Sequence, residues 1–349
     1  MKKIWIICLI AILSMLACSF TNILISSIDG RDSGMFWNIK RVSRSESCKV
    51  REEDLSIDNI EDLEMIFTSS DVRLILSDEP QIKIVQYSNS KENARKLSID
   101  KSSTKIRIEE TKKFYFFAIL PTNIYDIYIP KAYTNNLKLE AASSTIEADE
   151  DITLKNMDIT LASGDIKFKN LLKFEELKIF TVSGDININN LEGKKYDINT
   201  TSGDTTINKL NCEEGKLKSI SGEIIANSVN TSKFEVETTS GDIEIKNIQG
   251  KVEIKTISGE VEIDNIQGSI EGNTTSGDIQ INKFLVSSDS RIHTISGEVE
   301  VYLDETSNCT IDTKSISGDV GLPNGRNVVG TEPYNKLYIE TTSGDIKIK

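Results

Sequence analysis

Residues 238–284 read TTSGDIEIKNIQGKVEIKTISGEVEIDNIQGSIEGNTTSGDIQINKF, and the glycines of the three Ser-Gly-Asp/Glu triplets, Gly241, Gly259 and Gly277, are 18 residues apart. The same triplet occurs ten times in the chain of 349 residues, with its glycine at positions 164, 184, 203, 222, 241, 259, 277, 297, 318 and 344. A repeat of this length, present in so many copies, predicts a repeat architecture.

Apolar residues recur at fixed distances from each glycine. The positions two and four residues later are apolar in almost every copy, and only Thr205 is polar in the first of these columns. This alternation is typical of a strand with one buried face. A further apolar position seven residues after the glycine changes the spacing and predicts a corner, and another, five residues before the glycine, predicts a second strand that enters the turn. Each copy therefore reads as strand, turn, strand and corner.

One copy alone has too few apolar side chains to offset the conformational entropy that is lost on ordering it. Stacked copies solve this problem, because each strand pairs with the same strand of the next copy and the apolar columns form a continuous core. We therefore predict an all-β chain whose residues 141–349 form a parallel β-solenoid, similar to a β-helix, with two strands in each coil of about 18–20 residues. The repeated glycine is expected to adopt a positive φ at the turn.

The N-terminal segment has the pattern of an export signal or membrane anchor. Lys2 and Lys3 precede an apolar run, and residues 1–26 contain enough apolar positions to cross a bilayer. Cys18 follows Leu16-Ala17 as in a lipoprotein cleavage site, so lipidation of Cys18 is an alternative to an uncleaved anchor, and secretion after cleavage is a third. Each of these places the rest of the chain outside the cytoplasm, at the outer face of the cell membrane.

Residues 27–52 show no periodicity and read as a stalk. Residues 53–140 have irregular strand patterns, with candidate strands at 82–87, 105–109, 114–120 and 124–129. The segment around Ser70 resembles the repeated turn with serine in place of glycine. We interpret residues 53–140 as a cap on the solenoid, because an exposed first coil needs one. A separate small β domain is the alternative.

The degenerate turns, the stretch DIYIPKAYTNNLKLEAASSTIEA from Asp126 and the ten triplets together resemble the bacterial putative-adhesin family of β-strand repeat proteins, a domain of unknown function. The resemblance covers residues 53–349. It implies a β-solenoid attached to the membrane on the cell surface, and it implies no catalytic residues.

The third residue of each triplet is acidic, so stacking would align a column of carboxylates. The regular part of this column is Asp204, Glu223, Asp242, Glu260, Asp278 and Glu298. Neighbouring charges about 4.8 Å apart repel one another unless they are solvated, hydrogen-bonded or bridged by cations. We expect solvated side chains that cap the turns, with calcium as the alternative. A Thr or Ser three residues before each glycine from Gly184 onward forms a second column, which we expect to hydrogen-bond between coils, while sugar or ice binding is the alternative.

Charge and composition narrow the function. The chain has a formal net charge of −13, which argues against nucleic acid as a partner. His293 is its only histidine, and no serine lies in a nucleophile elbow, so we expect no enzymatic activity and no cofactor. Two classes remain: a surface binding or adhesin-like module, with a glycan or surface protein as ligand, and a structural or regulatory component of the cell envelope.

Two further expectations concern the C-terminal region. The interval between Gly318 and Gly344 is longer than the others, which predicts a loop that leaves the coil at residues 323–325 and returns by Tyr334. Its simplest interpretation is a tolerated surface insertion. The strand Ile346–Lys349 is expected to be the outer edge of the last coil, where Lys347 and Lys349 would deter pairing and keep the protein monomeric.

Overall fold

The computed structural model describes residues 47–92, 94–111 and 122–349. The predicted anchor, the stalk up to residue 46, Cys18 and the candidate strand 114–120 lie outside these residues. No helix in the described part of the chain is long and apolar enough to span a membrane. Cys48–Lys349 forms one compact unit, and its first strand, β1 (Cys48–Ser56), begins within the segment interpreted as a stalk.

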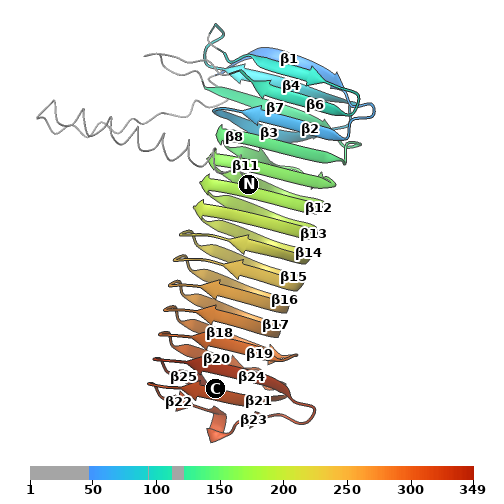
Figure 1. Ribbon diagram of the computed structural model, residues 1–349. Coiled ribbons are helices and arrows are strands. Elements are labelled where there is room, and N and C mark those ends of the chain that lie inside the picture. Colours follow the sequence, from blue (N-terminus) through green and yellow to red (C-terminus); the bar gives the residue numbers. More distant parts are fainter. Residues whose placement is uncertain (1–46, 93, 112–121) are drawn as a thin grey trace, which may run out of the picture. The chain divides into compact units, whose positions relative to one another are not determined.

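Long bent strands build the centre of this unit, one strand for each coil (Figure 1). Each pairs in parallel with the next along the chain. These strands are β12 (Ile166–Ser183), β13 (Ile186–Ser202), β14 (Thr205–Lys218), β15 (Ile224–Glu237), β16 (Ile243–Thr256) and β17 (Val261–Thr274). The predicted parallel β-solenoid is therefore confirmed.

The predicted apolar columns form the core. The residues two and four positions after the glycine are buried from coil to coil, as Ile243, Ile245, Val261 and Ile263 show. In the later coils the corner interrupts the hydrogen bonding between strands, so that each coil consists of two separate strands, as predicted. This occurs in β18 (Ile279–Val286), β19 (Ser290–Thr294), β20 (Val299–Leu303) and β21 (Cys309–Ser315).

In most turns the reason for the repeated glycine is different from the predicted positive φ. Gly164, Gly184 and Gly203 have a positive φ, between 118° and 135°. From Gly222 onward the repeat glycines are absent from the positive-φ residues, so the predicted reason is wrong for them. Their constraint is close stacking, because a Cβ on Gly259 would lie 1.9 Å from the carbonyl oxygen of Gly241 in the preceding turn. Only a residue without a side chain fits between turns stacked this closely.

At the N-terminal end, the order of coils in space differs from their order in the sequence. The first coil comprises β2 (Asp62–Phe67) and β3 (Ser70–Ser77). It lies between a later coil, β6 (Lys105–Glu110) with β7 (Asn123–Pro130), and the coil formed by β8 (Asn136–Ser143) and β9 (Ile146–Ala148). The first coil is thus paired on both sides, and the long excursion between β3 and β8 covers it.

Antiparallel strands complete this end. The strand β5 (Leu97–Lys101) pairs with β6, β4 (Gln81–Ser88) pairs with β7, and β1 pairs with β4. On the other side, β11 (Asn156–Ser163) pairs with both β8 and β12, and β10 (Ile152–Thr153) pairs with β12. All of these strands belong to one continuous sheet.

A buried carboxylate explains the missing glycine in the first turn. Ser70 occupies the glycine position, and its hydroxyl donates to Oε1 of Glu110 at 2.6 Å. The other carboxylate oxygen, Oε2, accepts the backbone N–H of Thr68 at 2.7 Å and faces the Arg95 guanidinium at 3.6 Å. Glu110 and Arg95 are both buried. The turn in this coil is therefore held by side chains from the excursion.

The C-terminal end repeats the change of order, and here the sequence prediction is wrong. The strand β24 (Asn335–Thr341) pairs with β19 on one side and with β21 on the other. In the same way β25 (Ile346–Ile348) lies between β20 and β22 (Val320–Gly321). The last strands of the sequence are therefore an inner coil, and the edge predicted for Lys347 and Lys349 lies one coil further out.

The long interval before Gly344 makes this order possible. A 3-10 turn, η2 (Pro323–Gly325), follows β22, and β23 (Val328–Val329) pairs antiparallel with β21 before the chain enters β24 (Figure 1). The loop leaves and returns where the sequence predicted. It is also part of the architecture, because it covers the outer edge of β21 and carries the chain back to the preceding coil position.

Candidate functional site

The predicted acidic column caps turns through its aspartates. The Asp204 carboxylate accepts the backbone N–H of Glu223 at 2.9 Å, and Asp242 and Asp278 accept the amides of Glu260 and Glu298 in the same way. Stacked turns therefore satisfy their amides with the carboxylate from the preceding coil. The described residues contain no group of three or more His, Cys, Asp or Glu side chains that could hold a metal ion.

The column carries an electrostatic cost at Glu223, which is half-buried. The pKa of Glu223 is raised, first because its carboxyl group loses solvent and then because Asp204 lies nearby with the same charge. The geometry thus confirms the expected capping role for the aspartates, whose carboxylates accept the turn amides.

Most of the Thr/Ser column is buried, and five of its hydroxyl groups accept a backbone N–H of their own turn. Ser315 is half-buried, and its hydroxyl donates to the Gly344 carbonyl oxygen of the neighbouring coil at 3.3 Å, as predicted. Thr238 Oγ1 accepts the backbone N–H of Gly241 at 3.0 Å and donates to its carbonyl oxygen at 2.7 Å, and Thr274 does the same for Gly277. The predicted hydrogen bonding between coils is wrong for these residues, because the hydroxyl points into the turn. Their burial also removes this column as a sugar- or ice-binding surface.

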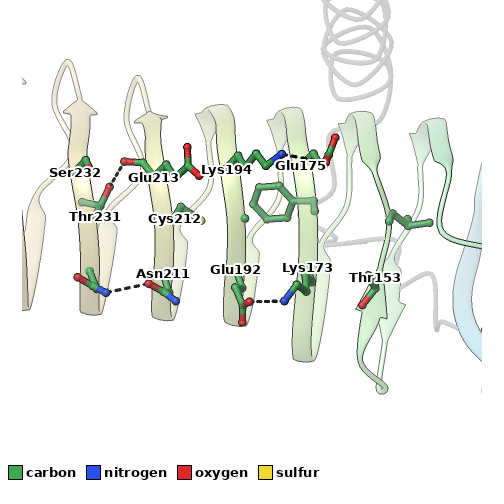
Figure 2. Close-up of a pocket in the computed structure, with 14 residues that line it drawn as sticks. Thr153, Lys173, Glu175, Glu192, Lys194, Asn211, Cys212, Glu213, Thr231 and Ser232 are labelled. Atoms are coloured by element: carbon green, nitrogen blue, oxygen red, sulfur yellow. Dashed lines mark hydrogen bonds and ion pairs between the residues drawn. The ribbon is translucent and has the colours of Figure 1, made fainter.

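An open groove lies along another corner of the stack, over the strands β10 and β12–β15. Its volume is about 630 Å³. Figure 2 shows two outer rows of polar side chains, the rims of the groove, and a middle row that forms its floor. Each coil from β12 to β15 contributes one residue to each row. The groove is therefore a consequence of stacking, since the register places equivalent residues side by side.

The first rim contains Thr153, Lys173, Glu192, Asn211 and Asn230. Lys173 donates to Glu192 at 2.6 Å, and Asn230 Nδ2 donates to Asn211 Oδ1 at 3.0 Å. Hydrogen bonds between neighbouring coils thus hold these side chains in line.

The second rim contains Glu175, Lys194, Glu213 and Ser232. Lys194 donates to Glu175 at 3.1 Å across the coils, and all four residues are exposed. Together the two rims carry three carboxylates and two ammonium groups, and most of this charge is paired. The groove therefore presents alternating donors and acceptors and no strong field of one sign.

The floor is apolar at one end and polar at the other. The Phe174 ring lies over Gly193, so closely that a Cβ on Gly193 would be 2.5 Å from the ring. Cys212 and Thr231 continue the row, and both are buried. Gly193 thus leaves room for the ring of its neighbour and keeps the floor level.

Cys212 is a free cysteine, and burial raises the pKa of its thiol to about 12. A thiol with such a pKa is almost entirely protonated at neutral pH, and the thiolate is the reactive form. Cys212 therefore acts as a small apolar residue of the floor.

Sequence reasoning missed the groove. Its residues in β12–β15 lie eight to eleven positions after the repeat glycines, where no single residue type and no hydrophobic period recurs in every coil. The one available signal was Gly193, a glycine outside the repeated turns. The candidate residues named from the sequence lie in the Ser-Gly turns. None of them lines the groove.

Comparison with known proteins identifies relatives of the whole repeat region. A family model described as Toastrack DUF4097 matches residues 60–246 and 216–349. No curated protein matches.

Solved structures similar to this chain include a putative adhesin from Parabacteroides distasonis ATCC 8503, at 15% identity and a TM-score of 0.49, over 66% of this chain and 96% of that chain. A putative lipid binding protein from the same organism has 14% identity and a TM-score of 0.46, with the same coverage. A putative cell adhesion protein from Clostridium sporogenes ATCC 15579 has 13% identity and a TM-score of 0.27, over 87% of this chain and 99% of that chain.

Proposed function

Because the chain belongs to the Toastrack DUF4097 family, whose model matches residues 60–246 and 216–349, we propose that it is a non-catalytic binding module at the outer face of the cell membrane. We further propose that the groove over β12–β15 binds a linear glycan. The observation that carries the proposal is the alignment of the two polar rims along the stack, with one residue contributed by each coil.

A periodic groove favours a periodic ligand. Successive coils are about 4.8 Å apart, so a linear polymer with a similar repeat would meet a polar rim residue at each coil. The rims offer amides, hydroxyl groups, carboxylates and ammonium groups, which suit a ligand rich in hydroxyl and amide groups. The largely paired charges give no preference for a highly charged polymer.

Two features support a binding role without catalysis. The Cys212 thiol in the floor is held in its protonated form by burial, and His293, the only histidine, lies in β19, outside the groove. Two of the three rim carboxylates are engaged by lysines, in the pairs Lys173–Glu192 and Lys194–Glu175. A general base needs a free lone pair directed at a substrate, and these pairs occupy that position.

The location at the membrane rests on the sequence of residues 1–26, with Cys18 as an alternative lipidation site. Fractionation of cells that express the full chain, with labelling by palmitate, tests this part separately. We expect the protein in the membrane fraction, accessible to protease added from outside. Label that is lost on Cys18→Ser would identify the lipidated form.

The groove is tested by calorimetric titration of the full chain in detergent micelles with soluble fragments of chitin and of cellulose that contain two to eight sugar units. We expect affinity to rise with length until the ligand spans the groove. Asn230→Asp should weaken binding, because it removes the amide that donates to Asn211 and adds charge at the rim.

A matched control comes from the same kind of asparagine pair at another corner. Asn265 Nδ2 donates to Asn247 Oδ1 at 3.3 Å, and neither residue lines the groove. Asn265→Asp should leave binding unchanged. Equal losses for the two variants, or no binding by any fragment, would refute the groove as a glycan site and favour a structural role in the envelope.

A further inference from the structure

The inner position of β24 and β25 creates an unusual relationship between three coils. The coils on either side of them, β19 with β20 and β21 with β22, follow one another directly in the sequence. Residues 335–349 are therefore an insert between two coils that are neighbours along the chain. We call the space that they fill the acceptor slot, bounded by Ser290–Leu303 and Cys309–Gly321.

The acceptor slot recognises the insert by its charges. Glu340 faces the Lys314 ammonium at 2.7 Å on one side, and Arg291 at 3.8 Å and His293 at 3.7 Å on the other. If the insert were absent and the two coils closed on each other, the same register would place His293 beside Lys314. The slot therefore places a cationic side chain, Arg291 or Lys314, on each side of the Glu340 carboxylate.

The second half of the insert complements an acidic wall. Lys347 contacts Glu298, and Lys349 contacts Glu300 at 2.6 Å, with its ammonium 4.6 Å from the centre of the Tyr302 ring. The apolar side chains of Leu337, Ile339, Ile346 and Ile348 are buried in the core. A strand that fills the slot thus needs alternating apolar residues, one carboxylate and, further along, lysines.

The outer wall of the slot is made of a short strand and exposed apolar side chains. The strand β22 contains two residues, and β25 contains three, whereas β16 and β17 contain 14 each. Ile316 is 71% exposed and Val320 is 42% exposed, so the outer coil buries little apolar surface. Local stability follows such contacts, and coils at an end of a stack open more readily than coils inside it.

We propose that the acceptor slot is a strand-exchange site, and that residues 335–349 of one copy fill the slot of a second copy to form a dimer. Exchange preserves every contact of the insert, so it changes little besides chain entropy. Residues 322–334 form the connection and can extend over roughly 43 Å at about 3.3 Å per residue, which is enough to reach a neighbouring molecule. The proposal is independent of the proposed glycan site.

The experiment uses pairs of full-length chains, each carrying one new cysteine, in a background in which Cys8, Cys18 and Cys48 are replaced by serine. One chain carries Asp312→Cys and the other, with a different tag, carries Tyr338→Cys. These residues are register partners in β21 and β24, and neighbouring parallel strands place them at about 4.8 Å, within the range of a disulfide. The two chains are mixed at high concentration in detergent under oxidising conditions.

We expect a disulfide-linked heterodimer between the tagged chains. The matched control pair is Lys216→Cys with Glu235→Cys, which are register partners in the uninterrupted strands β14 and β15. Because the interior coils cannot exchange without unfolding the stack, this pair should give at least about tenfold less heterodimer. Equal amounts of heterodimer from the two pairs would overturn the proposal.

A single chain with both Asp312→Cys and Tyr338→Cys completes the test. It should form the disulfide within one molecule and, once locked, should sediment as a monomer at concentrations where the unlocked protein forms dimers. If the internal disulfide fails to form in folded protein, the insert does not occupy the slot, and the proposal fails with it. A locked protein that dimerises as well as the unlocked one would also overturn it.

Discussion

The backbone N–H of Ser343 donates to the carbonyl oxygen of Ile295 at 2.9 Å, although the whole Gly318 turn lies between them in the sequence. Ser317 in turn donates to Thr342 at 3.0 Å. Each turn from Ser221 onward makes the same bond to the preceding turn in space. These hydrogen bonds form one continuous ladder, which follows the order of the coils in space at the C-terminal end.

This order also restores a pattern that the sequence interrupts. The residue two positions before the glycine alternates between threonine and isoleucine, through Thr201, Ile220, Thr239, Ile257, Thr275 and Ile295. Along the chain the next two are Ile316 and Thr342, which break the alternation. In space Thr342 precedes Ile316, so the alternation continues to the last turn.

The stacking of turns predicts that Gly259→Ala is strongly destabilising. The added Cβ would lie 1.9 Å from the Gly241 carbonyl oxygen, so two backbone segments must separate. We expect a loss of more than about 3 kcal/mol in the free energy of unfolding, the range of severe core defects. Chemical denaturation measures it.

The control for this variant is Gly272→Ala, at a glycine inside β17. Its added Cβ would meet Ile279 Cδ1 at 3.5 Å, an ordinary contact. The change should stay within about 1 kcal/mol of the wild type, because the methyl group adds packing and reduces the freedom of the unfolded chain. Similar losses in the two variants would contradict the stacking argument.

The buried hydroxyl of Thr256 predicts a second difference. Its Oγ1 accepts the backbone N–H of Gly259 at 3.1 Å, so Thr256→Val leaves a buried donor without a partner and should cost about 1–3 kcal/mol. Thr256→Ser retains the acceptor and should be much milder. Thr239→Val, at an exposed position, should change the melting temperature little, and a large shift there would show that the loss is not specific to the buried turn.

Glu237 predicts a dependence of stability on acid. A hydrogen bond from Lys216 lowers the pKa of Glu237 to about 2, with further help from Lys218. Because the folded-state pKa is below the unfolded one, the charged carboxylate stabilises the fold above its ordinary range near 4.5, and this contribution is lost as the pH falls toward 2. Melting temperatures between pH 5 and pH 2 should therefore fall less steeply in Glu237→Gln than in the wild type. Glu213→Gln, at an exposed residue of the groove rim, should keep the wild-type slope.

Deletion of residues 324–332 should prevent the insert from reaching its slot. The deletion removes β23 and leaves too short a connection to cross the coil from β22 to β24. We expect amide hydrogen exchange to lose protection in residues 290–349 while β12–β16 remain protected. Unchanged protection throughout would show that the loop is a tolerated surface insertion, as the sequence suggested.

The sequence by itself determined the repeat, the parallel solenoid and the buried columns. These features arise from contacts between equivalent residues of successive coils. The fixed positions of Ile243 and Ile245 relative to Gly241, repeated in the other copies, are therefore enough to predict them. The expected capping role of Asp204 and the other aspartates has the same origin, since each Ser-Gly-Asp/Glu turn presents an acidic residue at the same position.

Only the tertiary structure decided the order of coils at the two ends, the reason for most repeat glycines and the position of the groove. The order depends on which edges are complementary, as where Glu340 lies between Lys314 and His293, and chain order carries no information about such a choice. The groove arises where Phe174, Gly193 and Cys212, unlike one another in sequence, share one corner. A pattern repeated along the chain predicts contacts between like residues, whereas contacts between unlike residues appear only when the packing of particular side chains brings them together.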